Sequence, residues 1–245
     1  MRVALALCLV TAVAGGGCLD GLFSADVSPR DYLRDLDYTL WIIEVDYAEG
    51  ERPPDSALSL LRDRMQSVVR KPDGVEVRMD EVLEREETTW GTDSLRQLRR
   101  DHQDEETDGH TVVTHLSFVA GHSGEDDDEG RVLGVAIDHR QVVIFSQTVK
   151  SSCTVTSLPP CLYSTEEVFG AVVVHEFGHI LGLVNNGIPM VSDHQDESHG
   201  AHSDNPDSVM YWAVETTDIF QSLTGELPNQ FDADDRADLR AAGGR

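Results

Sequence analysis

The sequence predicts an α+β fold in which a mixed, twisted sheet packs against several helices. Segments rich in β-branched and aromatic residues alternate along the chain with segments whose apolar residues recur at helical spacing. Their order is strand, helix, strand, short helix, three strands and helix, which differs from the regular alternation of a doubly wound fold. The 245 residues are 40% apolar and 26% charged, as is typical of a globular body.

Five segments are predicted to be strands because they are short, apolar and rich in valine, isoleucine and aromatic residues. They are residues 38–47, 75–79, 110–120, 132–137 and 142–149. The first of them reads YTLWIIEVDY and is apolar enough to be buried in the sheet.

Helices are expected between these strands. Residues 55–70 follow two prolines and place Leu58, Leu61, Met65 and Val68 on one helical face, so this helix should pack on the sheet. Residues 92–100 form a weaker candidate. A further helix should begin at Ser164, because Ser164 and Glu167 have the spacing of a capping box.

The charge of the chain limits its partners. The sequence contains 19 lysines and arginines but 45 aspartates and glutamates, which gives a formal net charge of −26. A nucleic acid backbone would be repelled by such a protein, because binding to phosphates depends on positive charge. The sequence therefore predicts no nucleic acid partner.

The N-terminus is typical of an exported protein. Arg2 is followed by an apolar run that is too short to span a bilayer, and residues 1–17 therefore read as a signal peptide. The small residues before Cys18 resemble the processing site of a bacterial lipoprotein. This resemblance implies a lipid anchor at Cys18 as the only membrane contact, a tether over residues 18–35, and a location in the bacterial envelope; an ordinary secreted protein is the alternative. In an exported protein Cys153 and Cys161 can form a disulfide.

The predicted helix from Ser164 carries the residues with the clearest chemistry. Residues 175–179 read HEFGH, and the helix should end at Gly182. At 3.6 residues per turn, His175 and His179 lie on the same face, one turn apart. Two imidazoles at this spacing bind one metal ion with Glu176 beside it, which is the physical basis of the H-E-x-x-H motif.

Residues 175–183 resemble the signature of the metzincin zinc peptidases and are closest to the matrixin-like members. In that family a third histidine ligand follows the glycine by three residues, where this chain has Asn185. An amide is a poor zinc ligand beside imidazole. The stretch HSDNPDSVMY from His202 is similar to the family's third ligand and Met-turn, so we assign His202 as the third ligand and residues 184–201 as an insertion. His194 is the main competitor for this position and His199 a weaker one.

The resemblance extends beyond the helix. Residues 130–136 are similar to the family's edge strand, along which an extended substrate binds, and residues 231–239 are similar to its last helix. The resemblance thus implies a metzincin-like zincin fold with an active-site helix, a Met-turn at Met210 and a C-terminal helix. One catalytic domain should span residues 36–245.

These residues predict a zinc-dependent endopeptidase that acts on protein or peptide substrates. The ligands of Zn²⁺ would be His175, His179 and His202. Peptide bonds would be hydrolysed by a metal-activated water, with Glu176 as the general base. The alternative is a lipid-anchored lipoprotein that binds zinc or a partner without turnover. Pure metal binding does not require Glu176, so its presence favours the enzyme.

Overall fold

The computed structural model describes residues 27–84, 87–127, 130–152, 162–223 and 225–245. The predicted signal peptide, the anchor at Cys18 and the pair of Cys153 and Cys161 lie outside these residues. Among the helices of the described ranges, none has both the length and the apolar character needed to cross a membrane.

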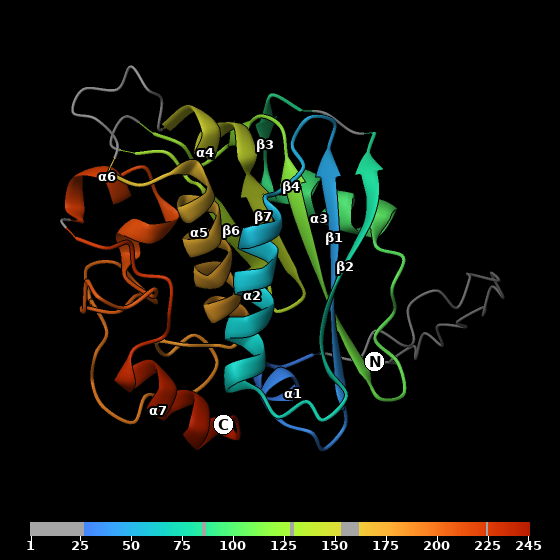
Figure 1. Ribbon diagram of the computed structural model, residues 1–245, viewed down its shortest axis with the longest axis vertical. Coiled ribbons are helices and arrows are strands. Elements are labelled where there is room, and N and C mark those ends of the chain that lie inside the picture. The colour runs from blue at the N-terminus through green and yellow to red at the C-terminus, as the bar shows by residue number, and fades with distance from the viewer. Residues whose placement is uncertain (1–26, 85–86, 128–129, 153–161, 224) are drawn as a thin grey trace, which may run out of the picture.

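The core of the fold is a five-stranded sheet with the strand order β2-β1-β4-β7-β6 (Figure 1). Its strands are β1 (Leu40–Ala48), β2 (Gly74–Leu83), β4 (Thr111–Val119), β6 (Gly134–Asp138) and β7 (Gln141–Phe145). All neighbours are parallel except β6, which runs antiparallel to β7 at the edge. The predicted mixed sheet is therefore confirmed. Two short strands, β3 (Thr89–Trp90) and β5 (His122–Ser123), pair separately.

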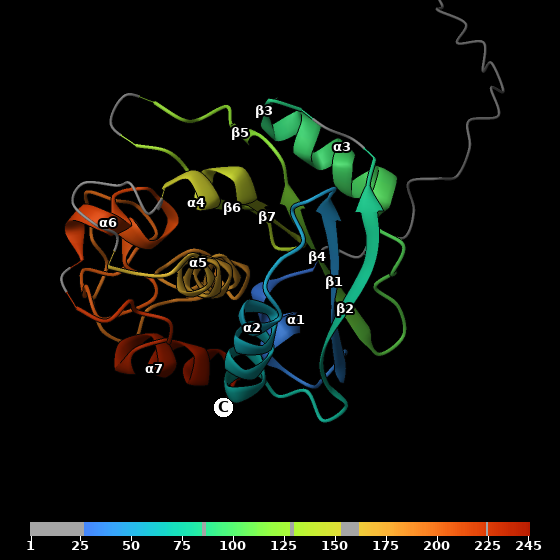
Figure 2. The ribbon, with the colours of Figure 1, turned by 45° about the horizontal axis from the view of Figure 1, so that its top comes forward.

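Helices cover both faces of the sheet (Figure 2). On one face lie α2 (Asp55–Val68) and α5 (Thr165–Ile180), and on the other lies α3 (Thr92–His102). The predicted helices thus form where expected. Side chains of β1 pack under α2 and α5, where the rings of Trp41 and Phe177 lie 5.7 Å apart. Helix α5 is enclosed on all sides, and each of its residues from Val168 to Ile180 is buried.

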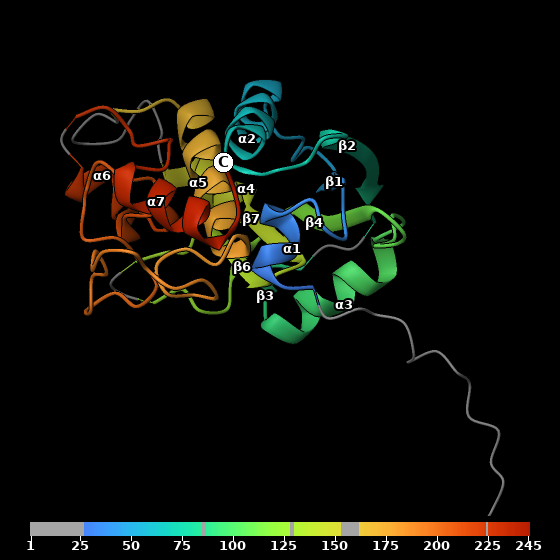
Figure 3. The same ribbon diagram turned by 90° about the horizontal axis from the view of Figure 1, so that it is seen from below.

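The chain after α5 lies on the far side of that helix from β1 and β2 (Figure 3). It contains the 3₁₀ helix η1 (Trp212–Glu215), α6 (Ile219–Ser222) and α7 (Ala233–Ala242). The N-cap of α7 is Asp232, whose carboxylate accepts from the backbone N–H groups of Asp234 and Asp235. This helix forms within two or three residues of the C-terminal helix that the resemblance implies.

One predicted strand is too long. The sequence predicts a strand over residues 142–149, but β7 ends at Phe145 and helix α4 (Ser146–Ser152) begins directly after it. Phe145 and Val149 are both buried and are spaced by four residues, which suits one helical turn as well as it suits a strand. Such a short apolar run does not distinguish the two.

The sequence predicts a tether over residues 18–35, but the part of it from residue 27 onward packs into the body of the protein. Helix α1 (Pro29–Leu33) buries Tyr32 and Leu33 completely. The buried ammonium group of Lys71 donates to the carbonyl oxygens of Asp31 and Tyr38, both at 2.6 Å, and to that of Arg34. Apolar burial and satisfied backbone carbonyls thus hold this segment in the fold.

Candidate metal centre

Helix α5 positions the first two candidate ligands. Ser164 and Glu167 form the predicted capping box, in which the Ser164 hydroxyl accepts from the Glu167 N–H at 3.3 Å and the Ser164 N–H donates to the Glu167 carboxylate at 2.7 Å. One turn before the helix ends, the Nε2 atoms of His175 and His179 lie 3.1 Å apart. The spacing in the sequence therefore yields the predicted pair.

The structure brings His202 to this pair. The His202 ring stacks on His175 with centroids 5.2 Å apart and lies edge-on to His179 at 5.1 Å. All three rings are nearly buried, with relative exposures of 0%, 9% and 8% for His175, His179 and His202. One ligand atom of each lies within 4.8 Å of the others, as binding to a single ion requires.

The residues between Gly182 and His202 return the chain to the helix. His194 is buried against α7, with its Nε2 atom 2.9 Å from the Asp238 carboxylate. The other Asp238 oxygen accepts from the Val191 N–H at 2.6 Å. Backbone bonds then pair residues 194–196 with residues 202–204, from Asp204 N to His194 O and from Asp196 N to His202 O. His194 is therefore engaged with α7 and lies apart from the cluster.

Asn185 and His199 also lie away from the cluster. Asn185 is exposed and has a left-handed φ of 60°. The exposed ring of His199 stacks on Trp212 at 4.2 Å, and its Nδ1 atom lies 2.6 Å from the Asp196 carboxylate. Neither residue belongs to the group of ligand atoms that converges at His175.

Backbone carbonyls orient two of the three rings. The Nδ1 atom of His175 lies 2.6 Å from the Val209 carbonyl oxygen, and that of His202 lies 2.6 Å from the His199 carbonyl oxygen. A carbonyl only accepts, so each Nδ1 carries a proton, and Nε2 is the ring atom that faces the cluster. Such outer contacts fix the tautomer of metal-binding histidines.

Met210 packs against α5 at Gly178, between the two histidines of the motif. It is fully buried, and a Cβ at position 178 would lie 2.1 Å from its sulfur atom. Gly178, in the middle of the HEFGH motif, is therefore required for Met210 to approach the helix. The Met210 carbonyl accepts from the Ser203 N–H at 2.8 Å, which holds this segment beside the third histidine.

Glu215, at the end of η1, completes the cluster and is a residue that the sequence motifs do not reveal. One carboxylate oxygen lies 3.4 Å from His175 Nε2 and 3.8 Å from His179 Nε2, and the other lies 3.2 Å from His202 Nε2. Glu215 follows Met210 by five residues, and this spacing belongs to none of the metal-binding motifs considered above. The one signal is that Glu215 is the only acid between residues 208 and 217.

Burial sets the charges in the cluster. It is the main cause that lowers the pKa of His179 to about 3, with His175 adding to the effect, and so keeps the imidazole neutral as a metal ligand must be. Burial likewise raises the pKa of Glu176, and the nearby Glu215 adds to this. For Glu215 burial acts in the same direction, but His175 and His202 outweigh it, and its pKa lies below the ordinary value.

The carboxylate of Glu176 is fully buried next to the edge strand. Neither of its oxygens has a hydrogen-bond partner among the described residues. A Cβ at position 134 of β6 would lie 3.0 Å from its Oε1 atom, so Gly134 lets the strand lie directly on this side chain. Glu176 thus lies buried between the histidine cluster and β6.

A second group of metal-ligating side chains, Glu44, Asp46 and His115, lies buried in the sheet. Its atoms are already engaged. His115 Nε2 lies 2.7 Å from Asp46 Oδ2, and the two Glu44 oxygens accept from the backbone N–H groups of Asp104 and Glu105 at 2.7 and 2.8 Å. These bonds account for the polar groups without a metal ion.

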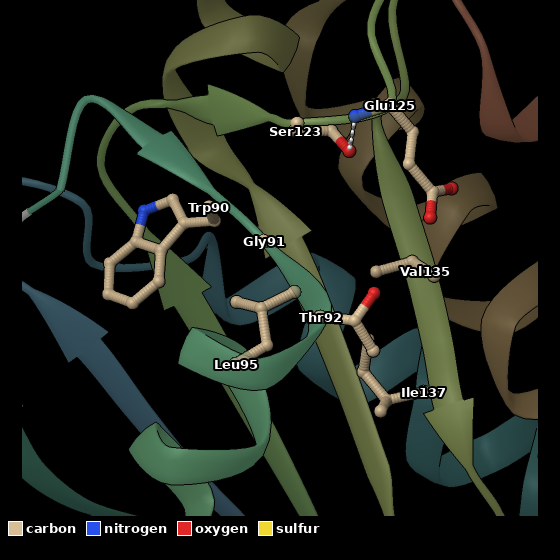
Figure 4. A pocket seen from close by; sticks show the side chains of 9 residues that line it. Trp90, Gly91, Thr92, Leu95, Ser123, Glu125, Val135 and Ile137 are labelled. Atoms are coloured by element: carbon tan, nitrogen blue, oxygen red, sulfur yellow. Dashed lines mark hydrogen bonds between the residues drawn. The ribbon is translucent and has the colours of Figure 1, made fainter.

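A small pocket of about 190 Å³ lies across β6 from the metal centre (Figure 4). Val135 and Ile137 of β6 form one wall, and Trp90 and Leu95 contribute apolar surface. Along a strand, successive side chains point to opposite faces. The pocket is therefore separate from the side of β6 on which Gly134 contacts Glu176.

The residues of the cluster fit Zn²⁺. Three neutral imidazoles and a carboxylate are the nitrogen and oxygen donors that zinc takes in proteins. Ligand atoms at 2.0–2.1 Å around a tetrahedral zinc lie about 3.3 Å from one another. The His175–His179 separation of 3.1 Å is close to that value, and the two Glu215 oxygens lie 3.2–3.8 Å from the three Nε2 atoms. The buried Nε2 of His202 faces Glu215 at 3.2 Å, and a metal ion held by both groups would satisfy this contact.

The fold and the donor set thus define a mostly parallel α/β body with a zinc-type centre on its central helix. No family model matches the sequence, and no curated protein does. Among solved structures, the chain is similar to an archaemetzincin from Methanopyrus kandleri, with 12% identity, a TM-score of 0.50, and coverage of 83% of this chain and 96% of that one. This likeness shows the fold.

Two further solved structures are similar at lower scores. An archaemetzincin from Archaeoglobus fulgidus has 14% identity and a TM-score of 0.43, with coverage of 80% of this chain and 99% of that one. A zinc-dependent peptidase from Methanocorpusculum labreanum has 14% identity, a TM-score of 0.44 and the same two coverages.

Proposed function

We propose that the protein is a zinc-dependent endopeptidase with His175, His179 and His202 as its metal ligands. The observation that carries the proposal is the convergence of three imidazoles beside the buried carboxylate of Glu176. The fold agrees with this function, since the similar Methanopyrus kandleri structure is that of an archaemetzincin. As finer proposals, the chain is a matrixin-like metzincin and Met210 forms its Met-turn.

Each residue has a role in the proposed reaction. A zinc ion at the three histidines would polarise the scissile carbonyl and lower the pKa of the attacking water. Glu176 accepts the proton of that water at its carboxylate and then delivers it to the nitrogen of the leaving amine. Burial suits both tasks, because a raised pKa brings the carboxyl group closer to the pH at which it works.

The substrate is proposed to bind along β6. This strand lies at the edge of the sheet and contacts Glu176 through Gly134, so a peptide that adds to it as a further strand passes the metal centre. Alternate side chains of such a peptide point to opposite faces. The pocket at Val135 and Ile137 lies on one of these faces, and its lining combines apolar side chains with Glu125 at its rim, which suits a substrate residue that is largely apolar.

The test is a Glu176→Gln variant, which keeps the size of the side chain and removes the proton acceptor. We expect hydrolysis of unfolded casein to fall by roughly 10²- to 10⁴-fold, while the zinc content stays at one ion per chain. Glu226→Gln, which makes the same change at an exposed position, serves as the control. Wild-type turnover by the Glu176→Gln protein would exclude this residue as the general base.

Export and lipid anchoring at Cys18 remain proposals that rest on the N-terminal sequence. Radiolabelled palmitate incorporation into the full-length protein, compared with a Cys18→Ser variant, tests the anchor. A disulfide between Cys153 and Cys161 is proposed on the same basis, and a mass measurement with and without reduction decides it.

A further inference from the structure

Glu215 occupies the corner of the cluster that a catalytic zinc leaves to water. Catalytic sites typically use three protein ligands and keep a fourth position open, whereas structural sites are closed by four. Here the Glu215 carboxylate lies 3.2–3.8 Å from all three Nε2 atoms and is itself largely buried, with 26% of its side chain exposed. The chain thus supplies its own fourth donor.

We propose that Glu215 is a fourth ligand of the zinc ion and holds the centre closed until the carboxylate leaves. This inference rests on the proposed function and concerns the regulation of the same site. In the closed state no position remains for water, so the peptidase is latent. Opening requires only that one side chain withdraws, while the three histidines keep the ion.

The hydrogen bonds around the cluster support metal ligation by Glu215. The Nδ1 atoms of His175 and His202 face backbone carbonyls and carry protons, so Nε2 is the atom of each ring that faces Glu215. The Glu215 oxygens are acceptors and lie 3.4 and 3.2 Å from these two Nε2 atoms. Two arrangements satisfy such contacts: a metal ion bound by the carboxylate and the imidazoles, or a proton on an imidazole that donates to Glu215. The zinc affinity of a Glu215 variant distinguishes them.

The backbone around Glu215 explains how the closed state would respond to substrate. The Leu133 N–H donates to the Glu215 carbonyl at 2.7 Å, and the Thr217 N–H donates to the Arg131 carbonyl at 2.9 Å. These bonds fix the backbone of Glu215 to the stretch that leads into β6, so only its side chain would have to move for the carboxylate to leave the cluster. A peptide that adds to β6 reaches this stretch, so its binding and the withdrawal of the carboxylate are linked.

The first measurement is zinc affinity, determined by competition with a chromophoric chelator for the wild type, Glu215→Gln and Glu226→Gln. Loss of the fourth donor should weaken zinc binding by roughly 10- to 100-fold in Glu215→Gln, since even outer contacts of metal ligands contribute that much. Glu226→Gln should match the wild type. Unchanged affinity in Glu215→Gln would mean that a proton alone holds the carboxylate, and would overturn the inference.

The second measurement asks whether the fourth position is open. Co²⁺ replaces zinc, and its visible absorption spectrum is followed as acetohydroxamate is added. We expect the Glu215→Gln spectrum to shift at hydroxamate concentrations at least tenfold below those that the wild type requires. Equal responses in the two proteins would show that Glu215 does not block the position.

These readouts separate the two proposals. If Glu215→Gln gains hydroxamate binding but no variant cleaves casein, the closed centre is supported and the peptidase function is excluded. If casein cleavage depends on Glu176, but the zinc affinity and the hydroxamate response are the same in Glu215→Gln as in the wild type, the peptidase function is supported and the closed centre is excluded. Protein that binds no zinc contradicts both.

Discussion

His202 and His194 have separate roles in this structure, and replacing each with alanine should separate metal binding from folding. His202 belongs to the metal cluster, whereas His194 pairs with Asp238 of α7. Both histidines are buried and lie only eight residues apart, so the two variants are closely matched. The measurements are zinc affinity by chelator competition and thermal unfolding of the metal-free protein.

The size of each effect follows from the contacts. A protein zinc site contributes roughly 10–16 kcal/mol over four ligand positions, or about 3 kcal/mol for each, so His202→Ala should weaken zinc binding by roughly 10²-fold. His194→Ala leaves the completely buried Asp238 without its charged partner. Such losses cost about 3–5 kcal/mol, and the lower end applies because Val191 N–H still donates to this carboxylate.

A loss of about 3 kcal/mol lowers the Tm of a chain of this size by roughly 6–12 °C. We therefore expect His194→Ala to unfold at lower temperature and to bind zinc within about threefold of the wild type. The metal-free His202→Ala protein should unfold closer to the wild-type temperature, since the contacts it loses are to the His199 carbonyl and to the partly exposed Glu215, and no completely buried carboxylate is left unpaired. The assignment of ligands is wrong if His194→Ala weakens zinc binding as much as His202→Ala does.

Two further predictions concern Gly134 and Asp235. In Gly134→Ala the new Cβ would lie 2.8 Å from Val172 Cγ1 and 3.0 Å from Glu176 Oε1, so casein turnover should fall roughly 10- to 100-fold with zinc content unchanged. Gly225→Ala, whose Cβ would meet no atom within 4 Å, is the control, and equal activities of Gly134→Ala and this control would contradict the reasoning. Burial raises the pKa of Asp235 from 3.8 to about 6, and its folded state thus binds a proton that its unfolded state releases. Between pH 4 and 6.5 the metal-free wild type should lose roughly 2 kcal/mol of unfolding free energy relative to Asp235→Asn in urea titrations, and parallel pH profiles would refute the shift.

The sequence alone determined the features that depend on local geometry. The capping box at Ser164 starts α5, and the turn of the helix places His175 and His179 together whatever surrounds them. The apolar runs likewise predicted the strands of the sheet within a few residues. Helix α4 is the exception, because a run as short as residues 146–149 has no unique periodicity.

The tertiary structure decided which distant residues meet that helix. Whether His194 or His202 joins the histidine pair depends on the path of the loop, which the buried contact of His194 with Asp238 fixes. The position of Glu215 depends on backbone pairing with residues 131–133. Helix α1, which contains Tyr32, is held in place by the hydrogen bond from Lys71 to the Asp31 carbonyl. Spacing along a helix is set by short-range bonds, whereas contacts between remote segments depend on the packing of the whole chain. The helix and its two histidines could therefore be predicted from the sequence, but the complete ring of donors could not.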